Sequence, residues 1–264
     1  MKFSRLSTCS PQVTLVGAGP GDPELLTIKA VKAIAAATVL LVDDLVSDAI
    51  TAYASSDARI IHVGKRGGCK STPQAFIEKL MVQEALAGET VVRLKGGDPF
   101  IFGRGGEEVE HLQAQGISVT VVNGITAGLA GITSLGAPLT HRAHAHGVLF
   151  ITGHAKQGAT DTVDWAALSR TVAQAKLTLV VYMGMSGVEQ MQTSLLQGLA
   201  TQTPVAVIQQ VSLPTQRHVV CTLGELQDTV VRNQMGSPSV IVVGDVIQGL
   251  QHIEQSRQRF VVAA

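Results

Sequence analysis

The chain has 264 residues, of which 45% are hydrophobic and only 3% aromatic, and its acidic and basic residues balance to a formal net charge of zero. The length suits one large or two medium α/β domains. A core with few aromatic residues must be built from Val, Ile, Leu and Ala, as in buried parallel strands. Nucleic-acid-binding proteins usually carry a basic excess, so the charge balance argues against a nucleic-acid partner.

The cysteines and the N-terminal segment indicate a cellular location. Cys9, Cys69 and Cys221 are odd in number and far apart, so they form neither a disulfide framework nor a Cys-x-x-Cys metal site. Residues 1–8 carry charge without a following apolar segment, unlike a secretory signal. The most apolar stretches are about half the length needed to cross a bilayer. We therefore expect a cytoplasmic protein that does not associate with a membrane.

The first half of the chain alternates strand and helix patterns. Short apolar runs predict strands at 13–16, 38–42, 59–63, 90–94 and 117–122. Residues 22–24 (Asp-Pro-Glu) have the N-cap, the proline and the first-turn acid of a helix start. Apolar residues follow at helical spacing, at Leu25, Ile28, Val31 and Ile34. A second helix is expected from 72 to about 87. This alternation predicts a mostly parallel sheet with helices on both faces.

The pattern breaks between residues 137 and 147, where Arg142 and three histidines lie, and we interpret this segment as a connection between domains. Further strands are expected at 148–152, 177–183, 205–209, 217–222 and 239–243, with helices near 185–198 and 225–233. The predicted organisation is an N-terminal α/β domain over 12–136, the connection over 137–147 and a C-terminal α/β domain over 148–250.

Two glycine-rich loops follow predicted strands, one at 17–23 and one at 96–108. Ligands of parallel sheets bind at the carboxyl ends of strands, and the segment 123–128 occupies the same kind of position. Phosphate-binding loops offer bare N–H groups and a lysine, whereas these loops present the carboxylates of Asp22 and Asp98. They therefore favour a ligand that is neutral or positive where it meets them, such as an amino group or a sulfonium.

Other ligand classes fit these motifs less well. The dinucleotide fingerprint needs a glycine where Asp22 stands, although Asp43 lies where a ribose-binding acid would be expected. Residues 64–71 come one residue short of a P-loop, because Cys69 replaces a required glycine. The three neighbouring histidines cannot converge on one ion from a strand, so no metal is expected. Their segment is either a solvated linker or a patch that attracts carboxylates, with Arg142 as the strongest candidate.

Two further positions have a plain structural interpretation beside a functional one. Arg104 and Glu107 would meet on one helical turn if a helix begins near Gly105. That contact is either a surface ion pair or part of a ligand site, since it adjoins a glycine loop. Met183 ends a predicted strand, where a methionine that fills the core is the default.

Taken together, these motifs resemble the tetrapyrrole methylase superfamily, and within it the branch that acts on uroporphyrinogen III. The resemblance runs from Val13 to about Val246 and rests on the segments 16–27, 63–68, 93–108, 124–127, 138–142, 182–184 and 238–239. Lys-Arg-Gly-Gly at 65–68 and Phe-Gly-Arg-Gly-Gly-Glu-Glu at 102–108 are specific to that branch. The resemblance implies a mostly parallel N-terminal sheet, a mixed C-terminal sheet, a ligand cleft between the two α/β domains, and a homodimer.

The resemblance implies S-adenosylmethionine as methyl donor. The positions that match its contacts are Pro20, Gly96, Gly97, Asp98, Ile101, Thr126, Ala127, Met183 and Val211. Asp98 could meet the positive charge of the methionyl part, and Thr126 would supply a polar handle. Val211 departs from the pattern, because the family has Glu-Asn-Gly where this chain has Gln-Gln-Val at 209–211. If the contact is made by the backbone, Val211 can still make it, but the close approach that a glycine allows is not expected there.

The implied reaction is the methylation of uroporphyrinogen III at C2 and C7, which gives precorrin-2 through precorrin-1 for siroheme- or cobalamin-type synthesis. Positions matched to proton handling are Asp43, Lys65 and Arg104; those matched to macrocycle binding are Arg104, Glu107, Arg142 and Met183. Arginine is a poor base, so Arg104 is better interpreted as a residue that pairs with a carboxylate or stabilises charge. The alternatives are a methylase of a later corrin intermediate, a nicotinamide oxidoreductase and a tetrapyrrole carrier.

Overall fold

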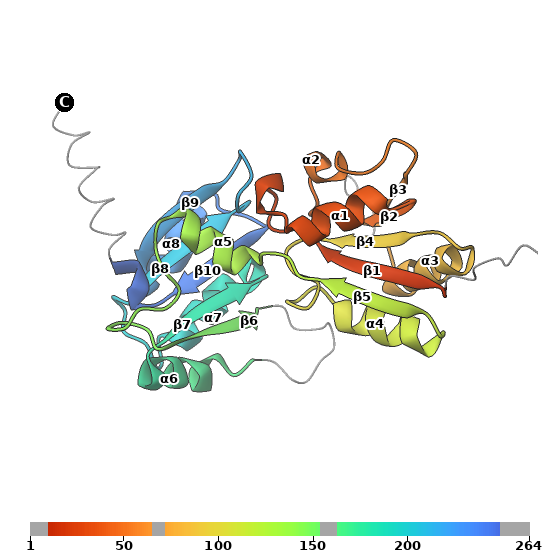
Figure 1. Cartoon of the computed structure of the whole chain (residues 1–264). Coiled ribbons are helices and arrows are strands. Elements are labelled where there is room, and N and C mark those ends of the chain that lie inside the picture. The colour runs from red at the N-terminus through yellow and green to blue at the C-terminus, as the bar shows by residue number, and fades with distance from the viewer. Residues whose placement is uncertain (1–9, 65–71, 154–162, 249–264) are drawn as a thin grey trace, which may run out of the picture. The chain divides into compact units, whose positions relative to one another are not determined.

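The structure, a computed structural model, describes residues 10–64, 72–153 and 163–248. The chain forms two compact units, one ending at Thr126 and the other beginning at Ala127. Figure 1 shows the elements of each unit in chain order. Within the described ranges, no helix is long and apolar enough to span a bilayer.

The N-terminal unit contains a five-stranded sheet in which every pairing is parallel. Its strands, in the order β3-β2-β4-β1-β5, are β1 (Gln12–Gly17), β2 (Val39–Val42), β3 (Arg59–His62), β4 (Val91–Lys95) and β5 (Ser118–Val122). Each overlaps a predicted strand, so the expected α/β class and the parallel sheet are confirmed.

Helices cover both faces of this sheet. Helices α1 (Ile28–Ala36) and α2 (Asp48–Thr51) pack on one face, and α3 (Gln74–Leu86) and α4 (Gly105–Ala114) pack on the other. Alternate side chains of β2 enter the two cores, Leu40 toward α1 and Leu41 toward α3, as the period of two in a strand requires.

The first helix begins later than the sequence predicts. Asp22 does act as an N-cap, because its Oδ1 accepts from the Glu24 N–H at 2.9 Å, but the helix it caps is only a 3₁₀ turn, η1 (Pro23–Leu25). Thr27 then caps α1 anew, with its Oγ1 accepting from the Ala30 N–H at 3.1 Å. Of the apolar residues at helical spacing, Ile34 is buried and Ile28 is 76% exposed.

The C-terminal unit contains a mixed five-stranded sheet, as the resemblance implied. The strands, in the order β6-β7-β10-β8-β9, are β6 (Gly147–Thr152), β7 (Leu177–Tyr182), β8 (Pro204–Gln209), β9 (Arg217–Thr222) and β10 (Ser239–Val243). Strands β6 and β7 are parallel, and the other pairings are antiparallel.

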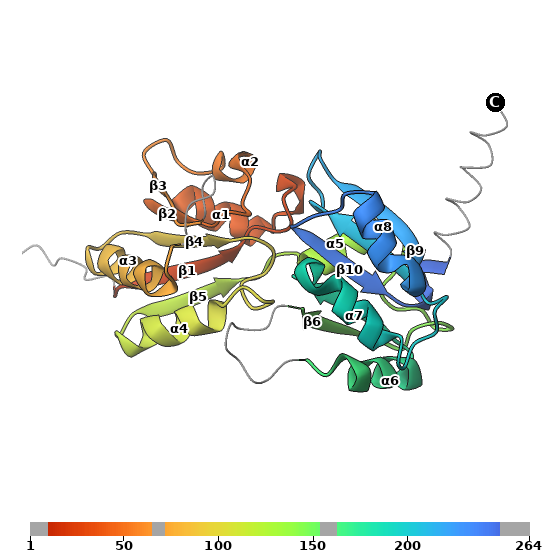
Figure 2. The same cartoon turned by 180° about the vertical axis from the view of Figure 1, so that it is seen from behind.

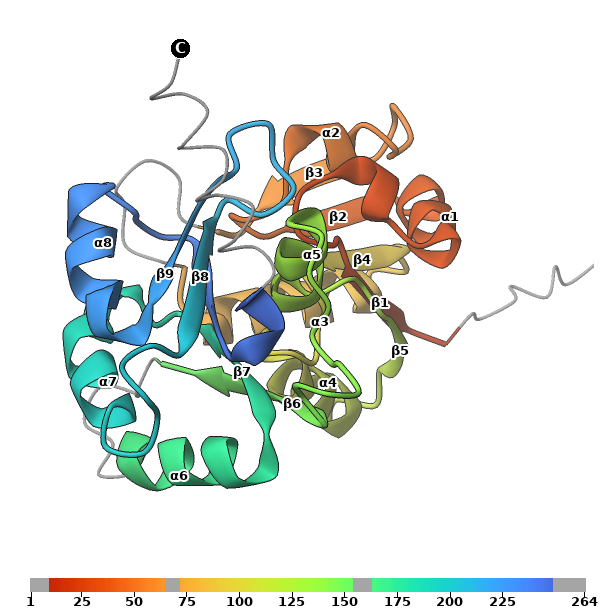
Figure 3. The same ribbon diagram turned by 90° about the vertical axis from the view of Figure 1, so that its left-hand side faces the viewer.

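Helices also cover both faces of the second sheet. One face carries α6 (Trp165–Ala175), α7 (Val188–Leu195) and α8 (Leu226–Arg232), which lie side by side in Figures 2 and 3. The 3₁₀ turns η2 (Met185–Gly187) and η3 (Leu223–Glu225) lead into α7 and α8. The other face carries α5 (Ala127–Ser134) and η4 (Asp245–Ile247).

The boundary between the units lies earlier than the expected one at residue 136, because α5 belongs to the second sheet. A Cβ atom on Gly131 would lie 3.1 Å from the Val211 side chain, so a glycine lets α5 approach closely. The expected connection over 137–147 also differs, since its residues Ala137, Leu139 and Ala145 are buried in the core under α5. That segment is therefore part of the C-terminal unit.

Candidate functional site

Three loops of the N-terminal unit meet where β1, β4 and β5 end. Gly19 and Gly97 exchange backbone hydrogen bonds, from the Gly19 N–H at 3.1 Å and from the Gly97 N–H at 2.7 Å. A Cβ on Gly17 would lie 2.4 Å from the Gly124 nitrogen, and one on Gly124 would lie 2.2 Å from the Gly97 oxygen. Only residues without a Cβ allow this approach. The expectation that the loops share one edge of the sheet is confirmed.

Asp98 ties two of these loops together. Its carboxylate is buried; Oδ1 accepts from the Phe100 N–H at 2.8 Å, and Oδ2 accepts from the Gly124 N–H at 3.1 Å and from Asn123 Nδ2 at 3.2 Å. The side chain therefore has three N–H donors from its own chain. Its predicted contact with a cationic cofactor stays a prediction and would involve a carboxylate already held in this way.

The other predicted cofactor residues of this unit border the same loops. A Cβ on Gly96 would lie 3.0 Å from Leu45 Cβ, and one on Gly97 would lie 3.9 Å from Thr126 Cα. Gly97 has a φ of +67°, which favours glycine. The structure thus gathers six of the predicted positions in one place: Pro20, Gly96, Gly97, Asp98, Ile101 and Thr126.

Arg104 and Glu107 form the predicted contact on the first turn of α4. Arg104 Nε donates to Glu107 Oε1 at 3.0 Å and Nη2 donates to Oε2 at 2.5 Å, while both side chains are more than half exposed. The hydrogen bond to Glu107 raises the pKa of Arg104. Arg104 therefore stays cationic and suits charge stabilisation better than proton abstraction. Its φ of +58° marks a left-handed residue at the helix start, a conformation often found at functional sites.

A buried ionic cluster lies behind the loops and was not expected from the sequence. We define it as Arg93 and Lys95 on β4, Glu108 on α4, and Asp43 after β2. Arg93, Lys95 and Glu108 are at most 2% exposed. Arg93 Nε lies 3.2 Å from Glu108 Oε1, and Lys95 Nζ lies 3.0 Å from Glu108 Oε2. Gln74 Nε2 donates to Glu108 Oε1 at 3.1 Å. Such partners are required because an unpaired buried ion is strongly destabilising.

Lys95 is the member of the cluster whose titration is most perturbed. Burial lowers the pKa of Lys95, the Arg93 cation lowers it further, and Glu108 and Asp43 oppose the shift. Glu108 Oε2, 3.0 Å from Lys95 Nζ, opposes the lowering of the pKa of Lys95 through its charge and its hydrogen bond but does not cancel it. The Lys95 ammonium is therefore only partly compensated for its loss of water.

Asp43 is the point at which this cluster reaches the surface. Arg93 Nη2 donates to Asp43 Oδ1 at 2.6 Å, and the Asp43 side chain is 31% exposed. It lines a cavity of about 440 Å³ whose other residues are Val42, Asp44, Val46, Asp48, His62 and Gly64. The Asp43 carboxylate is bound by Arg93 on its buried side and faces the cavity on its other side. It can therefore accept a proton from a ligand in the cavity. Lys65, which follows Gly64 in the sequence, lies outside the described residues.

The predicted residues of the C-terminal unit lie around the ends of β7, β8 and α5. Met183 does not fill the core, since it is 47% exposed and has a φ of +54°. Ala127 begins α5, next to Gly128, whose N–H donates to the Tyr182 hydroxyl at 2.8 Å. The side chain of Val211 is buried, and its predicted contact with the cofactor stays a prediction.

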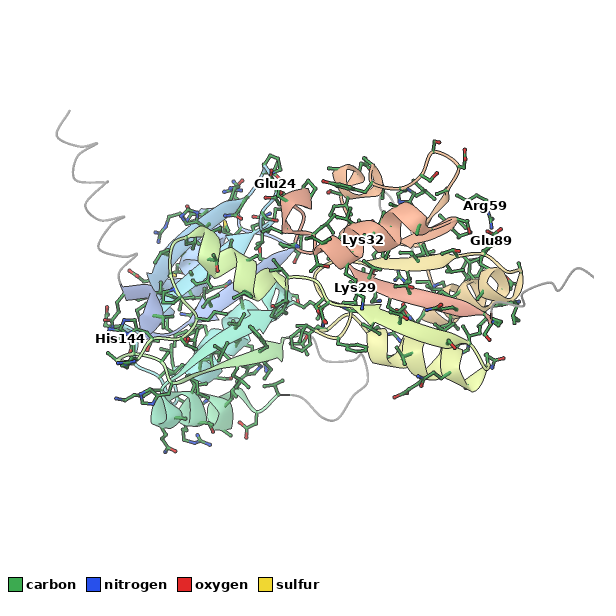
Figure 4. All side chains as sticks on the ribbon, in the orientation of Figure 1. Glu24, Lys29, Lys32, Arg59, Glu89 and His144 are labelled. Atoms are coloured by element: carbon green, nitrogen blue, oxygen red, sulfur yellow. The ribbon has the colours of Figure 1, made fainter. Side chains whose placement is uncertain are left out.

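Arg142 lies in a tight, exposed turn. The backbones of His141 and Ala145 exchange two hydrogen bonds of 2.9 Å, and His141 Nδ1 accepts from the Ala143 N–H at 3.1 Å. The ring of His144, labelled in Figure 4, lies 4.6 Å from that of His141. In the described ranges, no three His, Cys, Asp or Glu residues are grouped so as to hold a metal ion. The predicted role of Arg142 in binding carboxylates stays a prediction.

Known proteins share both the sequence and the fold. Residues 12–227 match the model of the tetrapyrrole (corrin/porphyrin) methylases. A uroporphyrinogen-III C-methyltransferase of Pseudomonas aeruginosa is 50% identical over 91% of this chain and 96% of its own. A siroheme synthase of Azotobacter vinelandii is 50% identical over 90% of this chain, which spans only 50% of that longer protein.

The solved structures include a uroporphyrin-III C-methyl transferase from Thermus thermophilus complexed with S-adenyl homocysteine. It is similar with a TM-score of 0.76 and 38% identity, over 90% of this chain and 99% of that one. The family match, the high identity and the similarity in fold agree with one another. The chain belongs to the tetrapyrrole methylase family.

Proposed function

We propose that the chain transfers methyl groups from S-adenosylmethionine to uroporphyrinogen III, first to one and then to the other of the ring carbons C2 and C7, giving precorrin-2 through precorrin-1. The observation that carries the proposal is the meeting of three glycine loops at the carboxyl ends of β1, β4 and β5. The glycines let these loops pack against one another at the end of the sheet where ligands of parallel sheets bind. The names of the most similar relatives supply the methyl donor and the macrocycle.

The chemistry of the first glycine loop supports a sulfonium ligand over a dinucleotide. Asp22 Oδ1 already accepts from the Glu24 N–H at 2.9 Å. A pyrophosphate would compete with this carboxylate for N–H groups at a helix start, and the two anions would repel. A ligand with a positive methionyl part meets no such competition.

In the proposed reaction a ring carbon of the macrocycle attacks the sulfonium methyl. A carbon–carbon bond forms, the carbon–sulfur bond breaks, S-adenosylhomocysteine leaves and the ring loses one proton. Asp43, which lines the cavity beside β2, would accept that proton. Arg104 would stabilise charge, and Lys65 would assist in proton handling. Correct placement of the two reactants would supply much of the rate enhancement.

The macrocycle carries several carboxylates, so its binding would use cations at the surface. Arg104, Glu107, Arg142 and Met183 are the residues we assign to it. The Arg104 guanidinium is already paired with Glu107. A carboxylate of the macrocycle would either bind Arg104 beside Glu107 or displace Glu107 from it. The resemblance also supports a cytoplasmic homodimer that serves siroheme- or cobalamin-type synthesis, and sedimentation of the purified protein would test the dimer.

A labelling experiment tests the reaction. The purified protein is incubated without oxygen with uroporphyrinogen III and methyl-labelled S-adenosylmethionine, and the labels on each macrocycle are counted. Two labels support the proposal, and one label supports a single methylation only. A folded protein that labels no uroporphyrinogen III but labels a later corrin intermediate would contradict the proposed substrate. Binding of the macrocycle without any use of the donor would indicate a carrier.

A pair of glycine variants tests the cofactor loops. Gly124→Ala places a Cβ 2.2 Å from the Gly97 oxygen, so the two loops must separate. We expect its affinity for S-adenosylhomocysteine, measured by calorimetry, to fall about tenfold or more, which corresponds to about 1.4 kcal/mol. Gly106→Ala is the control, because its Cβ would meet no atom within 4 Å. Wild-type affinity in Gly124→Ala, with the fold intact, would show that the ligand binds elsewhere.

Arg142→Ala tests the substrate role of the exposed turn. The variant should weaken binding of the macrocycle more than binding of S-adenosylhomocysteine, because Arg142 is assigned to the macrocycle, which carries several carboxylates where S-adenosylhomocysteine carries one. Arg170→Ala, an exposed arginine on α6, is the matched control. Calorimetry in which the cofactor affinity falls more than the macrocycle affinity would reverse the assignment.

A further inference from the structure

We propose that Arg93 is a positioning residue of the methyl transfer: anchored by Glu108, it holds the Asp43 carboxylate in the place from which that group accepts the ring proton. This inference rests on the proposed function, because it requires Asp43 to act on the substrate. It adds two residues, Arg93 and Glu108, that the sequence analysis did not assign to any role.

Burial limits Arg93 to an indirect role. Its side chain is 2% exposed, whereas that of Asp43 is 31% exposed and lines the cavity. A ligand in the cavity can therefore touch the carboxylate but not the guanidinium behind it. Any influence of Arg93 on the reaction must pass through the 2.6 Å contact between Nη2 and Asp43 Oδ1.

Besides its contact with Asp43, the Arg93 guanidinium makes three other contacts that fix its position. Nη1 donates to the carbonyl oxygens of Leu41 at 3.3 Å and Leu94 at 3.2 Å, and Nε donates to Glu108 Oε1 at 3.2 Å. These partners lie on β2, β4 and α4, so one planar group joins three elements. Because the fork of arginine is rigid, the contacts of Nη1 and Nε set the direction of Nη2. A lysine would carry the charge but could not satisfy this geometry.

Charge balance explains why Asp43 stays near Arg93. Arg93 and Lys95 are two cations, and Glu108 is the only carboxylate of the cluster that is fully buried. Asp43 supplies a second negative charge at the edge of the cluster. The backbone adds a further tie, because the Asp43 N–H donates to the Leu94 carbonyl at 3.1 Å. The carboxylate is thus held by its main chain and its side chain at once.

A double-mutant cycle separates positioning from a general structural effect. The variants Arg93→Lys, Asp43→Asn and the combination are compared by kcat and KM for methyl transfer. We expect Asp43→Asn to lower kcat by about 100-fold or more, as loss of a general base does, and Arg93→Lys to lower it by about tenfold with a small change in KM. In the Asp43→Asn background, Arg93→Lys should change kcat by less than about twofold, since no base remains to be positioned.

The control is another arginine of the same sheet. Arg59 on β3 also has two carboxylate partners, Glu84 and Glu89, but at the surface. Arg59→Lys should leave kcat and KM at their wild-type values in both backgrounds. Thermal unfolding of every variant shows whether it is folded at the assay temperature.

Glu108→Gln repeats the cycle with a milder change. It keeps the size of the side chain and leaves Arg93 in place, so it decides the question if Arg93→Lys does not fold. We expect a fall in kcat of about fivefold that disappears in the Asp43→Asn background. An equal fall in both backgrounds would overturn the inference, because the cluster would then act through overall stability alone.

The outcomes also separate this inference from the proposed function. A wild-type protein that transfers no methyl group contradicts the proposed function itself. A wild-type protein that transfers methyl groups, with full kcat retained in Asp43→Asn, leaves the methyl transfer standing but removes the role of Asp43 and with it that of Arg93. Methyl transfer with additive effects of Asp43→Asn and Arg93→Lys overturns the positioning role only.

Discussion

Two arginines of the N-terminal sheet, Arg93 and Arg59, differ in their surroundings more than in their partners. Arg93 on β4 contacts Asp43 and Glu108 and is 2% exposed, whereas Arg59 on β3 contacts Glu84 and Glu89 and is 53% exposed. Figure 4 labels Arg59 and Glu89 at the end of the unit. Water screens the exposed pair, but nothing replaces a lost partner in the interior. The burial of an ion pair, and not the number of its partners, therefore decides how much the charge affects stability.

The largest expected difference is between removing the two arginines. Arg93→Met should lower the free energy of unfolding by about 3–5 kcal/mol, because it breaks a buried pair and leaves Glu108 with less compensation. Arg59→Met should leave the denaturant midpoint unchanged, since its guanidinium is in water. Urea unfolding followed by circular dichroism measures both. Equal losses in the two variants would mean that exposure does not distinguish the clusters.

The adjacent glutamates of α4 give a smaller contrast within one helix turn. Glu108→Gln should cost about 1–3 kcal/mol of unfolding free energy, because a buried charged acceptor becomes a neutral one. Glu107→Gln should cost less than about 1 kcal/mol, since its pair with Arg104 is exposed. The same unfolding measurement applies. A larger loss for Glu107 would assign it a structural role that its surroundings do not suggest.

The smallest expected effect is the contribution of Lys95 to the pH dependence of the unfolding free energy. Burial lowers the pKa of Lys95 in the folded protein below its unfolded value of about 10.4, so the folded state releases this proton first as the pH rises. The unfolded state then binds more protons, and stability rises with pH until the unfolded value is reached. The unfolding free energy of the wild type minus that of Lys95→Met should therefore increase from pH 7 toward pH 10.

The matched control for this pH effect is Lys32→Met, at an exposed position of α1 that Figure 4 labels. Glu108, Arg93 and Asp43 surround Lys95 in every variant, so their contributions cancel to first order in the difference. A difference that falls with pH would contradict the assigned direction of the Lys95 shift.

The sequence was sufficient to predict the strands and the glycine edge because both depend on local signals. Apolar runs set the ten described strands, and glycine pairs after strands placed the loops at one end. The Arg104–Glu107 contact also followed from spacing alone. These features need only a few consecutive residues, so tertiary packing did not override them.

Helix α5 and the ionic cluster were missed because they depend on distant partners. The α5 sequence, Ala-Gly-Leu-Ala-Gly-Ile-Thr-Ser, contains two glycines that disfavour a helix, and its packing against β8 and β10 compensates for them. The cluster did leave a signal: Arg93 and Lys95 stand in the otherwise apolar run of β4. Two cations in a buried strand require anions nearby, but spacing could not name Glu108 or Asp43.

The hydroxyl of Tyr182 accepts the Gly128 N–H at 2.8 Å and so fastens the first turn of α5 to the last residue of β7. Ala127 immediately precedes one end of this fastening, and Met183 immediately follows the other. The hydrogen bond therefore couples the positions of Ala127 and Met183, two predicted cofactor contacts, to each other. Tyr182→Phe would remove this hydrogen bond, so that Ala127 and Met183 could move independently of each other while the surrounding sheet stays intact.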